Sequence, residues 1–354
     1  MVSVLVVTWN SARYLQQCFA SLDRQNYPDL EVVVIDNAST DGTREFLQSR
    51  EPLWHVIYND RNVGFAAGQN QAIRAAKGEW LLCLNPDVLL ADDFVNRLVE
   101  VGSAHPEVGS ICGKLLRWDP DHDPHQTRTI DSTGIYFTRN MRHLDRGAEE
   151  LDSGQYDRLQ YVFGATGAAA LFRRSFVEQV SMDGEFFDED FFSYREDADL
   201  AWRAQVMGWR CLYTPTAVAW HVRRVTPERR EQLPLVINWH SVKNRFLMRG
   251  KNASGWLCRR LFWPVAWRDL TIVGYALLRD RRLLSAIAYP WRVRDSVRRK
   301  RAIIQSRRKV SDRHLIWWFS DTLRATYADV TTSAIPVAAS PAAATDTSIS
   351  GDRP

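Results

Sequence analysis

Apolar and polar residues alternate in blocks along the first hundred residues of the chain. Each apolar block is short and uninterrupted, which is typical of a strand that is covered on both faces of a sheet. The stretches between the blocks place apolar residues at helical spacing, as in Leu15, Phe19 and Leu22. The predicted strands are Val2–Thr8, Leu30–Ile35, Trp54–Tyr58 and Trp80–Leu84, and a helix is predicted over Ala66–Ala76. This alternation favours an α/β fold with a largely parallel sheet.

Short polar residues stand where these predicted strands end. Thr8 and Asn10 lie at the end of the first strand, Asp36 follows the second, and Asn85 and Asp87 follow the fourth. Ligands of open α/β sheets bind beyond the carboxyl ends of the strands. We therefore expect these five side chains to line one crevice.

The middle of the chain is richer in strands. Val108–Phe172 is interrupted by turn sequences, and a helix is predicted over Asp197–Met207. Two short strands are predicted after it, over Cys211–Tyr213 and Val218–His221. We expect these elements to complete a single domain over residues 1–227.

Beyond Pro227 the pattern changes to long basic helices, and after Ala328 it becomes rich in Ala, Thr, Ser and Pro without periodicity. We expect a basic, Trp-rich helical extension over 228–318 and a mostly disordered tail over 319–354. The net charge of +4 is unevenly distributed. Residues 243–313 contain 20 Lys and Arg against 4 Asp and Glu, a net +16, and the remainder is net −12. Such a segment is expected to meet a polyanion, either a phospholipid surface or a nucleic acid.

Cysteine usage and the N-terminus bear on the compartment. The five cysteines are odd in number, scattered, and form no Cys-x-x-Cys pair, which argues against a disulfide framework and favours a reducing compartment. Val2–Val7 is too short for the apolar core of a signal peptide and is better interpreted as a first strand.

Several of the polar positions have chemistry that suits a nucleotide. Asp36 can accept hydrogen bonds from a base or a ribose, although Asp, Asn, Ser and Gly are also ordinary turn residues. Gly64 and Gly68 precede or open a helix, where backbone amides can approach a diphosphate. The carboxylate of Asp87 suits Mg²⁺ or Mn²⁺, with the diphosphate supplying further oxygen ligands. Each of these signals is weak by itself.

The order of the segments is more specific than any one of them. Between Val2 and about His221 the chain resembles the family 2 glycosyltransferases with a GT-A fold, especially their rhamnosyltransferase-like members. The segments that carry the resemblance are Val7–Asn10, Val34–Thr43, Asn62–Phe65 with Gly68 and Asn70, Leu84–Val88, Gly164–Ala168, Phe186–Phe192 and Glu196–Arg203. A looser similarity extends over Asn238–Lys251.

The resemblance implies a nucleotide-sugar site and a metal. Asp36 matches a nucleotide ligand, and Thr8 and Asn10 match walls of the base pocket. Asp87 matches the metal-binding second Asp of the family's Asp-x-Asp motif, whose first position is Asn85 here; that asparagine is expected to contact ribose or a metal-bound water. The remaining expected nucleotide-sugar contacts are Asn62, Gly68 and Asn70.

The pair Glu196–Asp197 matches the acidic pair from which the family's catalytic base comes. An acceptor hydroxyl is a poor nucleophile, so an inverting displacement needs a carboxylate that takes its proton. We expect Asp197 to be that base, kept ionised by the helix N-terminus; the alternative is that both acids only cap the helix. The resemblance also assigns His221 to the metal site, as a neutral imidazole ligand. Gly164–Gly167 is expected either to line the sugar pocket or to form a tight turn.

The sequence therefore predicts an inverting glycosyltransferase that uses Mg²⁺ or Mn²⁺, with dTDP-rhamnose as the first candidate donor. The acceptor is expected to be a hydroxyl of a lipid-linked or cell-surface glycan. Transfer from a UDP-hexose, or a catalytically silent nucleotide-sugar-binding module, are the alternatives. A sugar nucleotidyltransferase is disfavoured, because the N-terminus lacks the Gly-rich, Arg-containing loop that holds a triphosphate.

The basic extension mixes Trp, Tyr and Leu with Arg, and charges cut its apolar runs well below the roughly 20 residues that span a bilayer. This composition suits helices lying among lipid headgroups. We expect a cytoplasmic protein bound peripherally to the anionic inner face of the plasma membrane, and no nucleic-acid partner. Nucleic-acid binding and simple packing against the main domain are the competing interpretations.

Overall fold

The computed structural model describes residues 1–51, 53–223, 235–322 and 327–330. Its strands are β1 (Val2–Thr8), β2 (Leu30–Asp36), β3 (His55–Tyr58), β4 (Trp80–Leu84), β5 (Val88–Leu90), β6 (Val108–Arg117), β7 (Ile130–Ser132), β8 (Ile135–Phe137), β9 (His143–Asp145), β10 (Gln160–Val162), β11 (Ala169–Arg173), β12 (Arg210–His221) and β13 (Tyr327–Asp329). All but β8 and β9 belong to one sheet, whose main order is β13-β10-β12-β6-β11-β4-β1-β2-β3. β5 and β7 join it beside β12 and β6, respectively.

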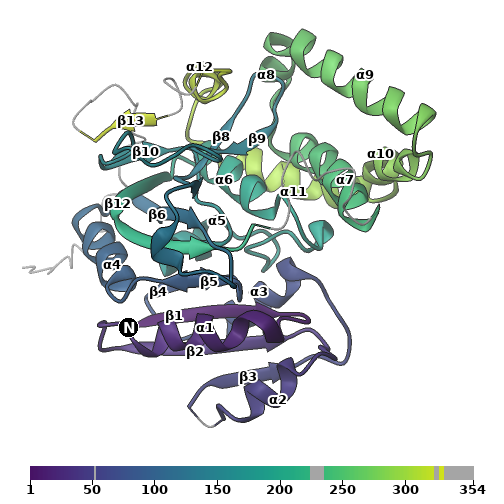
Figure 1. Cartoon of the computed structure of the whole chain (residues 1–354). Helices are drawn as coiled ribbons and strands as arrows, with labels where there is room; N and C mark the ends of the chain where they lie inside the picture. Colours follow the sequence, from purple (N-terminus) through teal and green to yellow (C-terminus); the bar gives the residue numbers. More distant parts are fainter. Residues whose placement is uncertain (52, 224–234, 323–326, 331–354) are drawn as a thin grey trace, which may run out of the picture.

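Helices cover this sheet and extend from one end of it (Figure 1). The α-helices are α1 (Ala12–Asp23), α2 (Thr43–Gln48), α3 (Phe65–Ala75), α4 (Phe94–Ala104), α5 (Arg174–Val180), α6 (Glu196–Val206), α7 (Leu235–Asn252), α8 (Gly255–Arg260), α9 (Phe262–Leu278), α10 (Leu283–Arg292), α11 (Arg294–Ser306) and α12 (Asp312–Leu315). None of the helices in the described ranges is long and apolar enough to cross a bilayer.

The first half of the sheet is parallel, as the sequence predicts. β1 lies between β2 and β4, and β3 continues the sheet on the far side of β2. Every residue of β1 and β4 is buried, which explains their uninterrupted apolar sequences. All four predicted strands and the predicted helix are confirmed, with ends shifted by one residue or less.

The second half of the sheet is mixed. β11 runs antiparallel to both β4 and β6, and β6 pairs in parallel with β12. Two short strands were expected where the structure has the single strand β12, whose register shifts between Tyr213 and Val218. Pro215 lies inside that irregularity and has no N–H to contribute to the ladder. The apolar pattern is therefore interrupted at this irregularity, although the residues on both sides of it belong to the same strand.

Two helices of the expected extension are held to the main domain by buried charges. Lys251 of α7 pairs with Asp188 and lies 3.1 Å from Asp199, and all three side chains are buried. Lys300 of α11 reaches the other oxygen of Asp188 at 2.6 Å and Glu185 at 2.8 Å. The two lysine ammonium groups lower the pKa of Asp188 against the effect of its burial. Part of the positive charge of the 243–313 segment is thus neutralised inside the protein.

Removing one of these buried cations should destabilise the fold. Lys300→Met would leave Asp188 and Glu185 short of a partner, and the loss of one member of a buried ion pair costs about 3–5 kcal/mol in the free energy of unfolding. The adjacent Arg299→Met is the matched control, because its pair with Asp183 is exposed and such pairs contribute little to the free energy of unfolding. Urea denaturation would measure both, and equal losses in the two variants would contradict the role assigned to Lys300.

Residues 319–322 and 327–330 fall within the expected disordered tail, yet the structure describes contacts for them. The side chain of Phe319 is buried and packs against Phe137 and Trp202. After it, β13 adds an antiparallel strand to β10. The sequence around β13 gives little indication of this pairing, because backbone hydrogen bonds hold the two strands together. Residues 331–354, to which the expectation of disorder also applies, lie outside the described part of the chain.

Candidate active site

The ends of β1, β2 and β4 bring the predicted polar residues to one edge of the sheet. Thr8 is the register partner of Asp36, and Val6 is the partner of Leu84, the residue before Asn85. Asn85 in turn donates its backbone N–H to Ala168, just before β11. The expected convergence of the strand ends is therefore found.

Asp36 is fully buried and already holds three hydrogen bonds. Its carboxylate accepts from the Thr8 hydroxyl at 3.0 Å, from the Ser39 backbone N–H at 3.1 Å and from the Arg44 guanidinium at 2.8 Å. A carboxylate has about four acceptor positions, so Asp36 could accept one further hydrogen bond. Thr8 is buried as well and acts here through Asp36.

Asn10 lies outside this buried pair, on the exposed loop after β1. Its side-chain oxygen accepts from the Thr40 N–H at 2.9 Å, and its own N–H donates to the Ser39 hydroxyl at 2.9 Å. Asn10 has φ +50°, a left-handed conformation that asparagine tolerates better than most residues. The loops after β1 and β2 are thereby joined into one wall.

The glycine-containing segment before α3 combines surface and packing roles. The Asn62 side chain accepts from the Gly64 N–H at 2.9 Å and lines an open pocket of about 470 Å³ together with Arg61 and Arg74. Gly64 has φ +91°, and a Cβ there would lie 2.6 Å from the carbonyl oxygen of Phe192. Of the predicted contacts in this segment, Asn62 is therefore placed at a surface that a ligand can reach.

Gly68 and Asn70 lie deeper, inside α3. A Cβ on Gly68 would be 2.9 Å from the Val7 side chain, so this glycine allows α3 to pack closely on β1. The Asn70 side chain is buried and accepts from the N–H groups of Phe186 and Phe187 at 3.1 and 2.9 Å. Both residues support the site, and the contacts seen for them are with protein.

Asp87 and His221 meet at the junction of β5 and β12. The Nε2 atom of His221 is 3.6 Å from a carboxylate oxygen of Asp87, and its Nδ1 atom is 2.8 Å from Asp131. No cluster of three or more His, Cys, Asp or Glu side chains with metal-binding geometry occurs in the ranges that the structure describes. An ion at this position would take two protein ligands and need further ones from a substrate.

The electrostatics of His221 differ from the expectation of a neutral ligand. Burial disfavours the charged ring, but attraction by Asp131 and then Asp87 outweighs burial and raises the pKa of His221 to about 10. The imidazole by itself is thus protonated near neutral pH. Since a ligating imidazole must be neutral, metal binding at Nε2 would release that proton while Asp131 still holds Nδ1.

Sequence reasoning missed the charged residues behind this pair. Asp131 is 1% exposed and also pairs with Arg223 at 3.3 Å, and Arg223 pairs with Asp145. Arg223 is one of the cations that act on Asp197, so the network connects the Asp87 side of the site to α6. The sequence around Asp131 is mostly polar and carries no signal that would have distinguished this acid.

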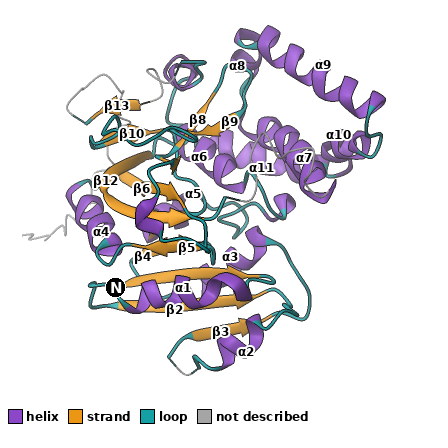
Figure 2. Ribbon diagram, in the orientation of Figure 1, coloured by secondary structure: helices purple, strands orange, loops and turns teal. Residues whose placement is uncertain are grey.

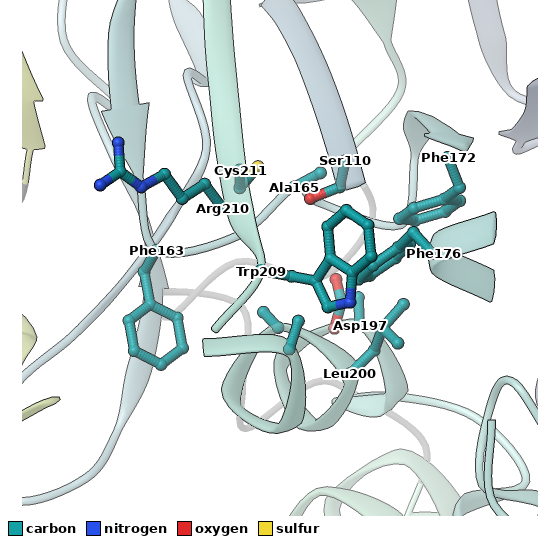
Figure 3. A pocket seen from close by; sticks show the side chains of 12 residues that line it. Ser110, Phe163, Ala165, Phe172, Phe176, Asp197, Leu200, Trp209, Arg210 and Cys211 are labelled. Atoms are coloured by element: carbon teal, nitrogen blue, oxygen red, sulfur yellow. The ribbon is translucent and has the colours of Figure 1, made fainter. Parts of the chain in front are cut away.

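Asp197 occupies the first turn of α6, opposite the turn before β11. One carboxylate oxygen accepts from the Gly167 N–H at 3.0 Å and the other from the Ala198 N–H at 2.7 Å. The segment Gly164–Gly167 therefore positions this carboxylate directly. Asp197 borders a cavity of about 10 Å³ that is lined by apolar side chains such as Phe172 and Leu200. Figure 3 shows these side chains around Asp197.

This surrounding reverses the expected direction of the pKa shift. The helix N-terminus was predicted to lower the pKa of Asp197, but burial raises it above 3.8, and the hydrogen bonds from Gly167 and Ala198 offset burial only in part. Glu196 is shifted further. Burial and then repulsion by Asp197 raise the pKa of Glu196 to about 8, and one of its carboxylate oxygens has no hydrogen-bond partner. Glu196 is thus mostly protonated near neutral pH.

Comparisons with known proteins identify the family and the fold. A model of the family described as "Glycosyl transferase family 2" matches residues 3–181. The chain is 28% identical over 308 residues to an N-acetylglucosaminyl-diphospho-decaprenol L-rhamnosyltransferase of Mycobacterium tuberculosis (strain ATCC 25618 / H37Rv). That alignment covers 80% of this chain and 96% of the relative.

Solved structures share the fold at low sequence identity. GalNAc-T7 with UDP, GalNAc and Mn²⁺ superposes with a TM-score of 0.55 at 15% identity, over 71% of this chain and 48% of that one. The mannosyltransferase PcManGT from Pyrobaculum calidifontis, in complex with GDP-Man and Mn²⁺, superposes with a TM-score of 0.50 at 20% identity, over 86% and 85%. The predicted GT-A fold is confirmed, and the chain belongs to glycosyl transferase family 2.

Proposed function

We propose that this glycosyltransferase inverts the donor anomeric carbon and moves rhamnose from dTDP-rhamnose to a hydroxyl of a lipid-linked glycan. The observation that carries the reaction class is the placement of a partly buried carboxylate, Asp197, and of the Asp87–His221 pair around the same strand ends. The choice of sugar and acceptor is supported by the likeness to the mycobacterial rhamnosyltransferase over 96% of that relative. A UDP-hexose donor is the alternative.

Asp197 is proposed to be the base. As the acceptor oxygen attacks the anomeric carbon, its proton passes to a carboxylate oxygen of Asp197, and the nucleoside diphosphate leaves from the opposite face. The N–H groups of Gly167 and Ala198 fix the direction of this carboxylate before the acceptor binds. Glu196 is proposed to remain protonated beside it and to take no proton from the acceptor.

The pair of Asp87 and His221 fits a divalent cation. Asp87 would supply an oxygen ligand and His221 would supply Nε2, a combination that suits Mn²⁺ better than Mg²⁺, which prefers oxygen ligands. Asp131 holds the other ring nitrogen and so fixes the orientation of the imidazole, as carboxylates commonly do behind ligating histidines. The ion would offset the negative charge that builds on the leaving diphosphate.

The lipid-linked acceptor and the location at a membrane are also parts of this proposal. An enzyme that acts on a lipid-linked glycan works at a membrane surface, and the basic segment over 243–313 suits the anionic inner face of the plasma membrane. A catalytically silent nucleotide-sugar-binding module would keep the fold but would not release a nucleoside diphosphate.

A donor panel would test the proposal. With Mn²⁺ present, dTDP-rhamnose is expected to raise the melting temperature more than UDP-hexoses or GDP-mannose do, because a ligand stabilises only the state that binds it. Adding a lipid-linked acceptor extract should then release dTDP. Stabilisation by a UDP-hexose alone would favour the alternative donor, and stabilisation without release of a nucleoside diphosphate would favour the silent module.

A further inference from the structure

Helix α9 carries an apolar stripe that faces solvent. Trp263, Trp267 and Leu278 are 79%, 70% and 84% exposed, and Leu270 is exposed as well. Their spacing of four, three and eight residues places them on one side of the helix. The stripe is roughly 22 Å long at 1.5 Å per residue. Figure 2 shows α9 standing away from the sheet, connected to the rest of the molecule through α8 and α10.

Positive charge surrounds the stripe at both ends. Arg259 and Arg260 precede α9, and Arg279 and Arg281 follow it; all four are exposed. These four arginines form no ion pair with any residue of the described ranges. The one acidic residue within α9, Asp269, points to α7, where it pairs with Arg245 and Arg249. The outward side of α9 is therefore apolar in the middle and cationic at its ends.

On the neighbouring basic helices α7 and α11, several of the cationic side chains are buried. On α7, Lys243, Arg245 and Lys251 are buried, and on α11, Lys300 is buried among carboxylates. These side chains cannot reach an external polyanion. The net charge of +16 along residues 243–313 therefore overstates the free positive surface, which is divided between the two ends of α9 and the exposed arginines of α11, such as Arg294 and Arg298.

We propose that the solvent-facing side of α9 is the membrane-binding surface of the protein and that its partner is an anionic phospholipid bilayer. Exposed Trp and Leu between arginines suit a helix lying in the headgroup region, with the indoles at the polar–apolar boundary and the guanidinium groups on lipid phosphates. A nucleic acid would instead be matched by cations along the whole helix.

This surface is joined through packed helices to the segment that precedes Glu196. Lys243 of α7 donates to the carbonyl oxygen of Asp190 at 2.6 Å, close in the chain to Glu196, and its ammonium group lies 4.9 Å from the ring centroid of Tyr289 on α10. α10 follows α9 in the chain, so packed helices connect the solvent-facing side of α9 to the proposed base, Asp197. The relevance of this connection rests on the proposed function, because only a lipid-linked acceptor would need it.

Vesicle flotation of the full chain tests the proposal. Vesicles of phosphatidylglycerol and phosphatidylcholine should carry the wild type at low salt, with part of the binding resistant to high salt. The triple variant Trp263→Ser, Trp267→Ser and Leu278→Ser should bind roughly tenfold or more weakly and lose the salt-resistant part. Replacing Arg259, Arg260, Arg279 and Arg281 by Gln should weaken binding to anionic vesicles roughly a hundredfold or more, with little effect on pure phosphatidylcholine.

The matched control is Leu53→Ser with Leu151→Ser, which removes two exposed apolar side chains far from α9 and should leave flotation unchanged. Failure of the wild type to float with anionic vesicles, or equal flotation of the triple variant, would overturn the proposal. So would a wild-type dimer that the triple variant converts to monomer without any flotation, because the stripe would then bind a second copy.

Activity separates this proposal from the proposed function. The triple variant should transfer sugar to a short water-soluble acceptor as the wild type does, and should lose transfer to an acceptor embedded in vesicles. Equal loss on both acceptors would place α9 in the acceptor site and overturn a membrane role. A wild type that floats but transfers to neither acceptor would contradict the proposed function and leave the membrane surface standing.

Discussion

Asp197→Asn is expected to lower kcat roughly 10²- to 10⁴-fold, the range for removal of a general base, while donor affinity stays near that of the wild type. An amide of the same shape can still accept from Gly167 N–H, so the turn before β11 should keep its position. It cannot take a proton from the acceptor. Initial rates of dTDP release with saturating acceptor, beside calorimetric donor binding, would measure the two quantities separately.

Glu196→Gln is the matched control for this prediction. Because Glu196 is mostly protonated near neutral pH, an amide resembles the form that is already present, and kcat should fall less than about tenfold. The neighbouring carboxyl groups differ in one respect that decides their roles: two backbone N–H groups hold Asp197, whereas one oxygen of Glu196 has no partner. An inactive Glu196→Gln with an active Asp197→Asn would show that the roles are reversed.

The pH dependence gives the same assignment an independent check. The base works as a carboxylate, so transfer should decline as pH falls through the pKa of Asp197. Burial raises that pKa, and the acidic limb of the kcat/KM profile should therefore lie above 3.8. Asp197→Asn should remove the limb from the residual activity. An identical limb in the variant would mean that another group titrates.

The parallel half of the sheet was predictable because β1 and β4 are buried on both faces and show it as uninterrupted apolar sequence. The strand ends could then be placed together, which located Asp36 and Asp87 without any structure. The direction of the Asp197 pKa shift was not predictable in this way. A helix N-terminus can be recognised in a sequence, but the apolar cavity behind it is lined by Phe172 and Phe176, which come from β11 and α5.

Charge was the least predictable property, because a sequence does not show which cations have buried partners. Lys300 and Arg259 contribute equally to the +16 of the basic segment, yet one is buried against Asp188 and the other is exposed. The same difficulty hid Asp131, whose partners His221 and Arg223 lie about ninety residues away in the chain. Such long-range pairs emerge only when β7 is placed beside β6 and β6 beside β12.

Asp87→Ala is expected to abolish metal-dependent transfer. If Asp87 and His221 hold the ion, losing the carboxylate removes one of two protein ligands and with it the charge stabilisation of the leaving diphosphate, and kcat should fall roughly a thousandfold or more. Excess EDTA should do the same to the wild type, and Mn²⁺ or Mg²⁺ should restore it. Asp92→Ala is the control, because it removes an exposed carboxylate that is close to Asp87 in the sequence but outside the site. This variant should transfer normally.

Asp131→Asn distinguishes a metal site from a simple ion pair between Asp87 and His221. Asparagine keeps an oxygen near His221 Nδ1 but loses the charge that fixes the ring, and weakening such a partner typically costs 10- to 100-fold in metal affinity (about one to two pKd units). Manganese EPR titration in the presence of dTDP would measure that affinity without relying on turnover. If Asp131→Asn and Asp87→Ala bind Mn²⁺ as the wild type does, the ion is held elsewhere; if the wild type is fully active in excess EDTA, transfer does not use one. Unchanged activity in Asp87→Ala would also show that Asp87 holds no ion that transfer needs. The Asp87–His221 contact would then serve only to join β5 to β12.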